Sequence, residues 1–210
     1  MNELTALFLS SFVTFLVVID PPGCAPIYAG LTRDCPPAQR RAMAIRAVLV
    51  ASGILLFFGL LGEDLLDALG VSLAAFRIAG GIMLFLIALE MVFERRTQRR
   101  ENRAQEVSAD PEHEVVSVFP MAIPMIAGPG SIASIMLLVA RSDGLTQTVT
   151  VFAALAAVLA LTLLALLAAG PLMRLLGHRM EAMLTRLLGV ILAALAAQFV
   201  IDGISVSFSV

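Results

Sequence analysis

Long apolar runs, separated by short polar segments, make up most of this chain. A helix needs about 20 apolar residues to cross a bilayer, so each run of that size predicts one membrane span. The pattern therefore predicts an all-α polytopic membrane protein with a single transmembrane domain over residues 1–210. Six spans are expected, at about Leu4 to Ile19, Ile45 to Leu61, Leu73 to Phe93, Val115 to Ala140, Val149 to Ala169, and Leu184 to Ile201.

Two of these runs contain residues that break helices. Residues 20–26 read Asp-Pro-Pro-Gly-Cys-Ala-Pro, and residues 127–130 read Ala-Gly-Pro-Gly. Proline lacks an N–H group and glycine favours other backbone conformations, so a regular helix should fail at both places. An unbroken helix from Leu4 to Leu31 would be roughly 42 Å long, more than a hydrocarbon core of about 30 Å. We expect helices 1 and 4 to be broken, tilted or re-entrant.

Composition and charge support the membrane interpretation and give it a direction. The chain is 60% hydrophobic and 14% charged, which is too apolar for a soluble domain. All 14 basic residues are arginine, and all except Arg77 and Arg141 fall on one side of the predicted spans. The positive-inside rule makes that side cytoplasmic, so both termini are expected to be periplasmic. No basic face for nucleic acid is present.

The remaining polar features favour plain interpretations. Cys24 and Cys35 are too few for a disulfide framework and are expected to be free thiols. Asp110, Glu112, His113 and Glu114 form a short acidic cluster. Without a rigid scaffold or metal-ligand spacing, the cluster indicates an exposed acidic turn and no metal site. Neither histidine has a nucleophile at a useful spacing, so enzyme activity is not expected. Glu90 is expected to reach toward Arg95 or Arg96 at the cytoplasmic surface.

The two halves of the chain resemble each other. Each half holds three spans, an odd number, so the second half must enter the membrane from the opposite side. Repeat one covers residues 1–93, a cytoplasmic loop 94–114, and repeat two 115–210. Inverted repeats with matching broken helices are typical of alternating-access carriers, which hold substrate near the midplane. A shift of 107 pairs Phe12 with Phe119, Pro22 with Pro129 and Gly23 with Gly130, and a shift of 109 pairs Arg77 with Arg186 and Gly80 with Gly189.

Three stretches also carry a family resemblance that extends over nearly the whole chain. They are DPPGCAPIY at 20–28, FRIAGGI at 76–82 and FPMAIPMIAGPGSI at 119–132. The chain resembles the MarC family of bacterial inner-membrane proteins. The resemblance implies a six-span protein of the wider LysE-type exporter superfamily, in which some relatives are described as carriers of small neutral amino acids such as glycine and alanine.

Asp20 is the first candidate for a functional residue. A carboxylate at a break inside an apolar run is costly unless it is paired, solvated or protonated. It could receive a substrate ammonium, bind Na⁺, or exchange a coupling proton. The alternative is that Asp20 caps the half-helix after the break by accepting from N–H groups beyond Pro22. Both roles can coexist.

The other candidates surround the two breaks. Glycines allow close approach of a ligand to the backbone, and half-helix N-termini carry partial positive charge that suits a carboxylate. Serine hydroxyls one turn apart could point to the same place, although bonding to backbone carbonyls is the simpler role. With Asp20, the predicted substrate-binding set is Pro22, Gly23, Gly128, Pro129, Gly130, Ser131 and Ser134.

Together these features predict a secondary transporter of small neutral amino acids or similar metabolites in a bacterial inner membrane. Its partners would be the lipid bilayer and a small-molecule substrate. No cofactor is expected, H⁺ or Na⁺ could be the coupling ion, and a homo-oligomer is compatible with the sequence. A non-transporting membrane scaffold and an inorganic-ion exporter or channel remain the alternatives.

Overall fold

The computed structural model describes residues 2–33, 35–95, 99 and 118–208, without the side chains of 118, 119 and 172–182. The predicted cytoplasmic loop 94–114, with its acidic cluster, therefore lies almost wholly outside the described residues. All regular structure among the described residues is helical. The elements are α1 (Glu3–Ile19), α2 (Pro21–Leu31), α3 (Pro37–Ala68), α4 (Leu73–Val92), the π-helix η2 (Val118–Ile126), α6 (Pro129–Val139), α7 (Gly144–Leu167) and α8 (Ala169–Ser207).

The first break is a single residue that separates α1 from α2. Asp20 has φ 59° and ψ 64°, a left-handed conformation that aspartate tolerates better than most residues. Its N–H still bonds to the carbonyl of Leu16 at 3.0 Å, which closes α1, and Pro21 then begins α2 with a preset φ. The chain passes on in the same general direction, because Glu3–Leu31 counts as one span of 29 residues.

The second break is sharper. Pro120 and Pro124 each lack an N–H donor, and the segment is wound as a π-helix in which the Ala127 N–H reaches the carbonyl of Ala122, five residues back, at 2.9 Å. Gly128 is extended, with φ −84° and ψ 171°, and Pro129 starts α6. Helical segments Pro120–Ile126 and Pro129–Val139 meet at 51°.

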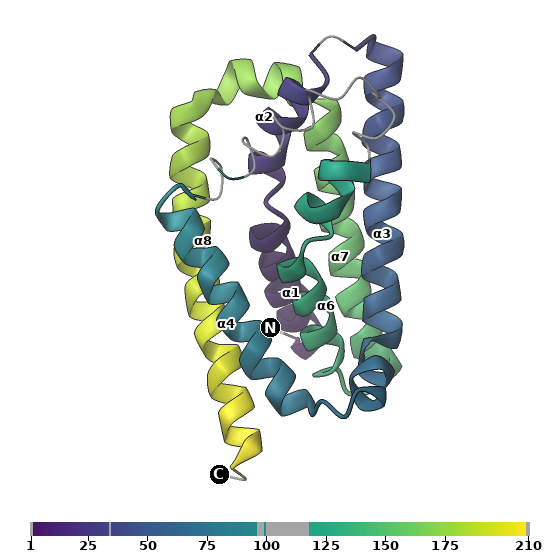
Figure 1. Cartoon of the computed structure of the whole chain (residues 1–210), viewed down its shortest axis with the longest axis vertical. Coiled ribbons are helices and arrows are strands. Elements are labelled where there is room, and N and C mark those ends of the chain that lie inside the picture. Colours follow the sequence, from purple (N-terminus) through teal and green to yellow (C-terminus); the bar gives the residue numbers. More distant parts are fainter. Residues whose placement is uncertain (1, 34, 96–98, 100–117, 209–210) are drawn as a thin grey trace.

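The two broken spans lie in the middle of the bundle (Figure 1). They run in opposite directions, α1 with α2 toward the upper end of the view and η2 with α6 away from it, with α3 and α7 on one side and α4 and α8 on the other. The contacts are also symmetric between the two halves. Helix α7 of the second half packs on the first broken span, and α3 of the first half packs on the second. The remaining equivalent helices pack on each other, α4 on α8 and α3 on α7. An inverted repeat produces this arrangement.

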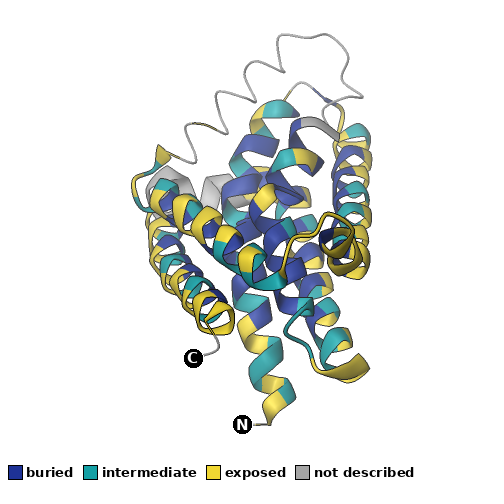
Figure 2. Cartoon of the chain, turned by 60° about the horizontal axis from the view of Figure 1, so that its bottom comes forward, coloured by how far each residue is buried: buried dark blue, intermediate teal, exposed yellow. Residues whose placement is uncertain are grey.

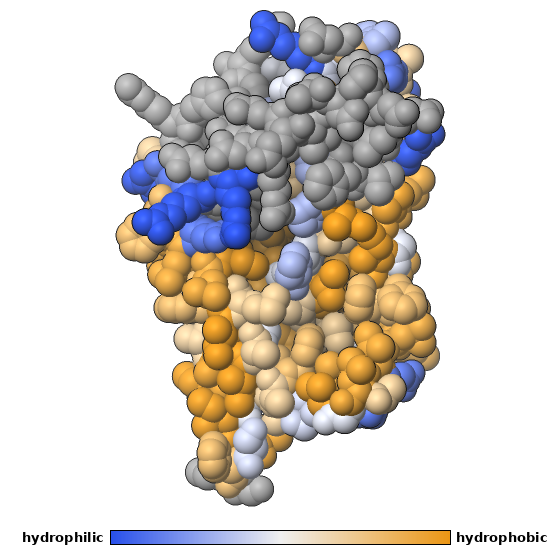
Figure 3. Space-filling model, in the orientation of Figure 1, coloured by the Kyte–Doolittle hydropathy of each residue, from blue (hydrophilic) through white to orange (hydrophobic). Residues whose placement is uncertain are grey.

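Among the described residues, five helical segments are long and apolar enough to cross a membrane, and there are six if the bent pair η2 and α6 is one span. Buried residues concentrate on the central helices, whereas the outer faces of the flanking helices are exposed (Figure 2). Those outer faces are strongly hydrophobic over the middle of the molecule, and the charged residues gather toward its ends (Figure 3). The predicted fold class, an all-α polytopic membrane protein, is confirmed.

Close packing between α4 and α8 depends on glycine. The two helices form the most extensive contact between described elements. A Cβ on Gly81 would lie 2.7 Å from Val200 Cγ2 and 2.9 Å from the carbonyl oxygen of Ala196. Gly189 and Gly203 on α8 face α4 with the same lack of space. Small residues of this kind let membrane helices approach closely and gain van der Waals contact.

Replacing Gly81 by alanine should therefore destabilise the protein, because backbone atoms of α8 cannot move away as a flexible side chain could. The expected loss is about 1–3 kcal/mol in the free energy of unfolding. Gly53→Ala in α3 is the matched control, since nothing lies within 4 Å of its added Cβ. It should be neutral or stabilising by up to about 1 kcal/mol. Unfolding of both purified variants in detergent measures the difference, and equal stabilities would contradict the packing role.

Candidate functional site: a cavity at the second break

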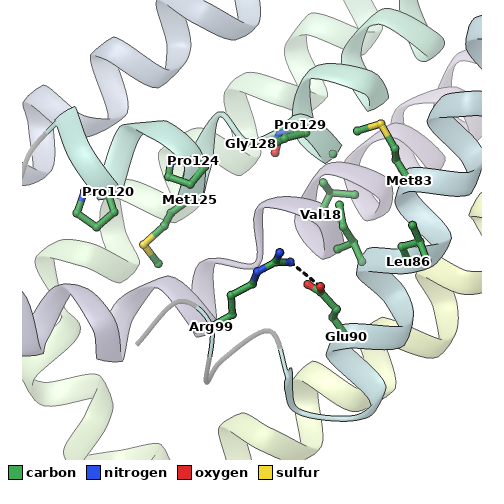
Figure 4. A pocket seen from close by; sticks show the side chains of 13 residues that line it. Val18, Met83, Leu86, Glu90, Arg99, Pro120, Pro124, Met125, Gly128 and Pro129 are labelled. Carbon is green, nitrogen blue, oxygen red and sulfur yellow. Dashed lines mark hydrogen bonds and ion pairs between the residues drawn. The ribbon is translucent and has the colours of Figure 1, made fainter. Parts of the chain in front are cut away.

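A cavity of about 560 Å³ lies where the second break faces α4. Its volume is within the range of about 300–1,000 Å³ that is usual for small-molecule sites. Figure 4 shows the side chains of α4 on one wall, prolines of η2 on the other, and the start of α6 between them. The lining residues are Val18, Met83, Leu86, Ile87, Glu90, Arg99, Pro120, Pro124, Met125, Gly128, Pro129, Gly130 and Ser131.

One ion pair contributes the charged side chains of this lining. Arg99 Nη1 lies 2.6 Å from Glu90 Oε1, and the two side chains are 64% and 32% exposed. The pair sits at the end of the cavity nearest the arginine-rich surface, because Glu90 is close to the C-terminus of α4. The remaining walls are mostly aliphatic or thioether side chains. Such a cavity offers one place for charge and an apolar surface beside it.

The structure brings only part of the predicted site together. Gly128, Pro129, Gly130 and Ser131 line the cavity, whereas the other predicted residues do not. The two breaks nevertheless approach each other, since a Cβ on Gly130 would lie 3.1 Å from Val18 Cγ1, two residues before Asp20. The predicted residues that do not line the cavity are Asp20, Pro22, Gly23 and Ser134.

Asp20 acts as a helix cap. Its side chain is 2% exposed, and Oδ1 accepts a hydrogen bond from the N–H of Gly23 at 3.1 Å. This confirms the capping alternative, with the carboxylate over the N-terminus of α2. Gly23 is required by the same contact, since a Cβ there would lie 2.3 Å from Asp20 Oδ2. Cys24 is also fully buried, with its thiol donating to the carbonyl of Ile19 at 3.4 Å.

The two breaks correspond with a shift of 108 at their helix starts. Pro21 and Pro129 are the first residues of α2 and α6, so the cap position of Asp20 is taken in the second half by Gly128. The shift of 107, which aligns the Pro-Gly pairs, would place Ala127 opposite Asp20. Gly128 provides no side-chain cap, and a Cβ on it would lie 2.3 Å from the carbonyl oxygen of Pro124.

Ser134 lies deeper in α6. It is fully buried, and its hydroxyl has no hydrogen-bond partner within the described part of the chain. Several helical hydroxyls among the described residues bond to a carbonyl one turn back, as Thr14 does to Ser10 and Thr162 to Val158. The back-bonding role considered from the sequence is therefore not seen for Ser134. Its neighbour Ser131 is 2% exposed.

Sequence reasoning missed Glu90 and Arg99 as lining residues. Glu90 was expected to pair with Arg95 or Arg96. Arg96 lies outside the described residues, and within the described part of the chain Glu90 pairs with Arg99. A carboxylate inside the third apolar run was a usable signal, because such a group is costly unless a partner or water meets it. The partner of Glu90 could not be predicted from sequence spacing. Arg99 lies after the end of α4, so its position depends on the path of the chain beyond that helix.

Polar contacts join three elements at the opposite end of the bundle. Arg141 pairs with Asp202 of α8, and its guanidinium lies 4.4 Å from the centre of the Phe199 ring. Arg77 of α4 donates to the carbonyl of Ala140 at 3.5 Å. Burial lowers the pKa of Arg141 and the nearby Asp202 carboxylate opposes that effect. These contacts hold the C-terminal end of α6 against α4 and α8.

The architecture and the cavity together define a class of protein. This is an integral membrane protein with several spans, two of them broken, and a cavity at one break. The chain belongs to the MarC family, because the profile described as MarC family integral membrane protein matches residues 5–208.

Similar proteins occur in archaea and bacteria. UPF0056 membrane protein MJ1677 of Methanocaldococcus jannaschii is 36% identical over 197 residues, covering 94% of this chain and 95% of that protein. UPF0056 membrane protein YvbG of Bacillus subtilis is 33% identical over 199 residues, covering 95% and 94%. UPF0056 inner membrane protein YhgN of Escherichia coli K12 is 34% identical over 204 residues, covering 97% of each. No solved structure matches this chain.

The contact between Asp20 and Gly23 gives a prediction. Gly23→Ala should push the carboxylate away from its N–H partner, with a loss of about 1 kcal/mol or more in the free energy of unfolding. Gly30→Ala in the same helix is the control, because its added Cβ meets nothing within 4 Å. Combining Gly23→Ala with Asp20→Ala should cost no more than Asp20→Ala alone, since the clash then disappears. Additive losses measured by denaturant unfolding would contradict this.

Proposed function

We propose that this protein is a secondary transporter of small neutral amino acids or similar metabolites. The main support is the position of the cavity, at the start of a half-helix inside a broken span. Irregular backbone is tolerated at membrane depth where it is packed in protein or lines a wet cavity, and carriers bind substrate at such points. In this proposal no covalent chemistry occurs, and the protein works in the inner membrane, where the name of YhgN places that relative.

The chemistry of the lining fits a neutral, zwitterionic substrate. A half-helix N-terminus favours a carboxylate, and Glu90 favours an ammonium group. Among the described lining residues, Glu90 and Arg99 balance each other in charge. A carrier of simple inorganic ions would have no use for the apolar walls formed by residues such as Met83, Leu86 and Met125.

Alternating access adds a mechanical reason. The cavity lies toward the arginine-rich end, while Arg141, Asp202 and Arg77 hold the other end of α6 closed. A carrier must close one side of its site while the other side is open. This conformation fits the inward-facing state of such a cycle, and H⁺ or Na⁺ is the proposed coupling ion.

Flux into liposomes tests the proposal. Purified protein reconstituted with an imposed proton or sodium gradient should accumulate labelled glycine, alanine or a larger neutral amino acid above empty liposomes. Glu90→Gln should lower the flux at least several-fold, because the ammonium partner loses its charge. Asp20→Asn should lower it less, by weakening the cap that fixes the first break.

The control variant for these measurements is Gly53→Ala, which is remote from the cavity and adds a Cβ in open space. It should transport at the rate of the unmodified protein. Absence of flux above empty liposomes for the whole amino-acid panel, with folded protein present, would overturn the proposed substrate class and favour a scaffold. Flux of inorganic ions without amino-acid dependence would favour an exporter or channel.

A further inference from the structure

The two half-helices after the breaks can be compared position by position. Each begins with proline at its first position, so that position has no N–H to satisfy. The third position is Gly23 in α2 and Ser131 in α6. In α2 the N–H of that third residue is bonded to a carboxylate, that of Asp20 at 3.1 Å. The inverted halves therefore contain one internal example of a carboxylate bound at a half-helix N-terminus.

The start of α6 has the same design without an internal carboxylate. Gly128 occupies the cap position and makes no side-chain cap bond. The first N–H groups of any helix lack intrahelical partners, so they require another acceptor. No larger residue fits at the cap without movement of the backbone, because the carbonyl oxygen of Pro124 would lie 2.3 Å from a Cβ on Gly128. Within the described part of the chain, this N-terminus thus has no side-chain cap.

A second observation at the start of α6 concerns Ser131. Ser131 is 2% exposed, lines the cavity of about 560 Å³, and forms no hydrogen bond through its hydroxyl among the described residues. A hydroxyl in a protein interior gains from a hydrogen-bond partner, and a ligand in the cavity beside Ser131 could supply one. The N–H and the hydroxyl of Ser131 therefore lie at the cavity, in the first turn of α6.

We propose that the N-terminus of α6 is the carboxylate subsite of the substrate, occupied in the way that the Asp20 carboxylate occupies the N-terminus of α2. The proposal rests on the transport function above and adds the substrate's orientation. The Ser131 N–H donates to the carboxylate as the Gly23 N–H does to Asp20, and the Ser131 hydroxyl adds a second donor. Charge-assisted bonds of this kind are stronger than bonds between neutral groups.

The rest of the lining then orients the substrate. Glu90, the carboxylate of the lining, receives the ammonium in exchange for Arg99. The substrate side chain lies against Met83, Leu86 and Ile87 of α4. This assigns the site to neutral α-amino acids with an apolar side chain, and it excludes amino-acid amides and amines that lack the carboxylate.

Three compounds of one carbon skeleton test the subsite. L-leucine, L-leucinamide and 4-methylpentanoate would be compared as competitors of labelled L-leucine binding to the full chain in nanodiscs. L-leucine should compete best, and L-leucinamide, which keeps the ammonium, should bind at least tenfold more weakly. Loss of the ammonium in 4-methylpentanoate should also weaken binding, and Glu90→Gln should reduce that particular difference.

The matched variants are Ser131→Ala and Ser142→Ala. Ser131→Ala should weaken L-leucine binding about threefold to tenfold while leaving the affinity for L-leucinamide nearly unchanged, because the lost donor serves the carboxylate. Ser142, which bonds to the carbonyl of Leu138 at 3.0 Å beyond the far end of α6, should be silent. A structural defect would lower both affinities equally, which separates it from loss of the subsite.

The outcomes distinguish the two proposals. Equal binding of L-leucine and L-leucinamide, with transport intact, would overturn the carboxylate subsite and leave the transport function standing. Binding of alanine but not leucine would overturn the apolar side-chain pocket. Absence of binding and flux for every amino acid would overturn the transport function itself.

Discussion

The structure depends on one constraint, the need to satisfy backbone hydrogen-bonding groups wherever a helix is interrupted inside the bilayer. Lipid offers no partners, so each break must find them within the protein. At the first break, the Asp20 N–H closes α1 and its carboxylate opens α2, so one left-handed residue satisfies both helix ends. At the second break, π-helical bonds absorb the loss of donors at two prolines. Both breaks must lie in the protein interior, which explains why the broken spans are central and the unbroken ones peripheral.

The two breaks satisfy this constraint in different ways, and the two halves of the chain therefore differ in role. At the first break, the buried Asp20 carboxylate of the chain itself accepts from the N-terminus of α2. Glycine at the equivalent position provides no side-chain cap at the second break, and a cavity lies beside it. The two breaks therefore have similar backbones but different cap residues. The first break, at Asp20, has a structural role, and the second, at Gly128, is the candidate site. Asp20 stabilises the first break by direct contact. Its effect on a ligand at α6 would be indirect, through packing such as that between Val18 and Gly130.

The fold could be predicted from the sequence because its determinants are local. Apolar length identifies spans, proline with glycine identifies breaks, and arginine distribution identifies one face. The site could be predicted only in part. The second break was recognised by the same residues that line the cavity. Glu90 and Arg99 are nine residues apart, and their contact depends on the course of the chain after α4, which no local pattern contains. The equivalence of the cap residues Asp20 and Gly128 also depended on where each helix starts. Two successive prolines precede Gly23, so an alignment of the Pro-Gly pairs is shifted by one residue from the alignment of the helix starts.

The positions of rigid and adjustable contacts indicate where movement can occur. Glycine contacts lock α4 to α8 through backbone approach, and such a surface cannot slide without clashes. The clamp at the far end of α6 consists instead of an ion pair at Arg141 that is about one-third exposed, a ring contact and one long hydrogen bond. Such contacts are individually weak and reversible in the presence of water. If the protein moves, we expect opening at the end of α6, with α4 and α8 moving as one body. The 51° bend between η2 and α6 is the natural hinge, because Pro124 and Pro129 remove backbone donors beside it.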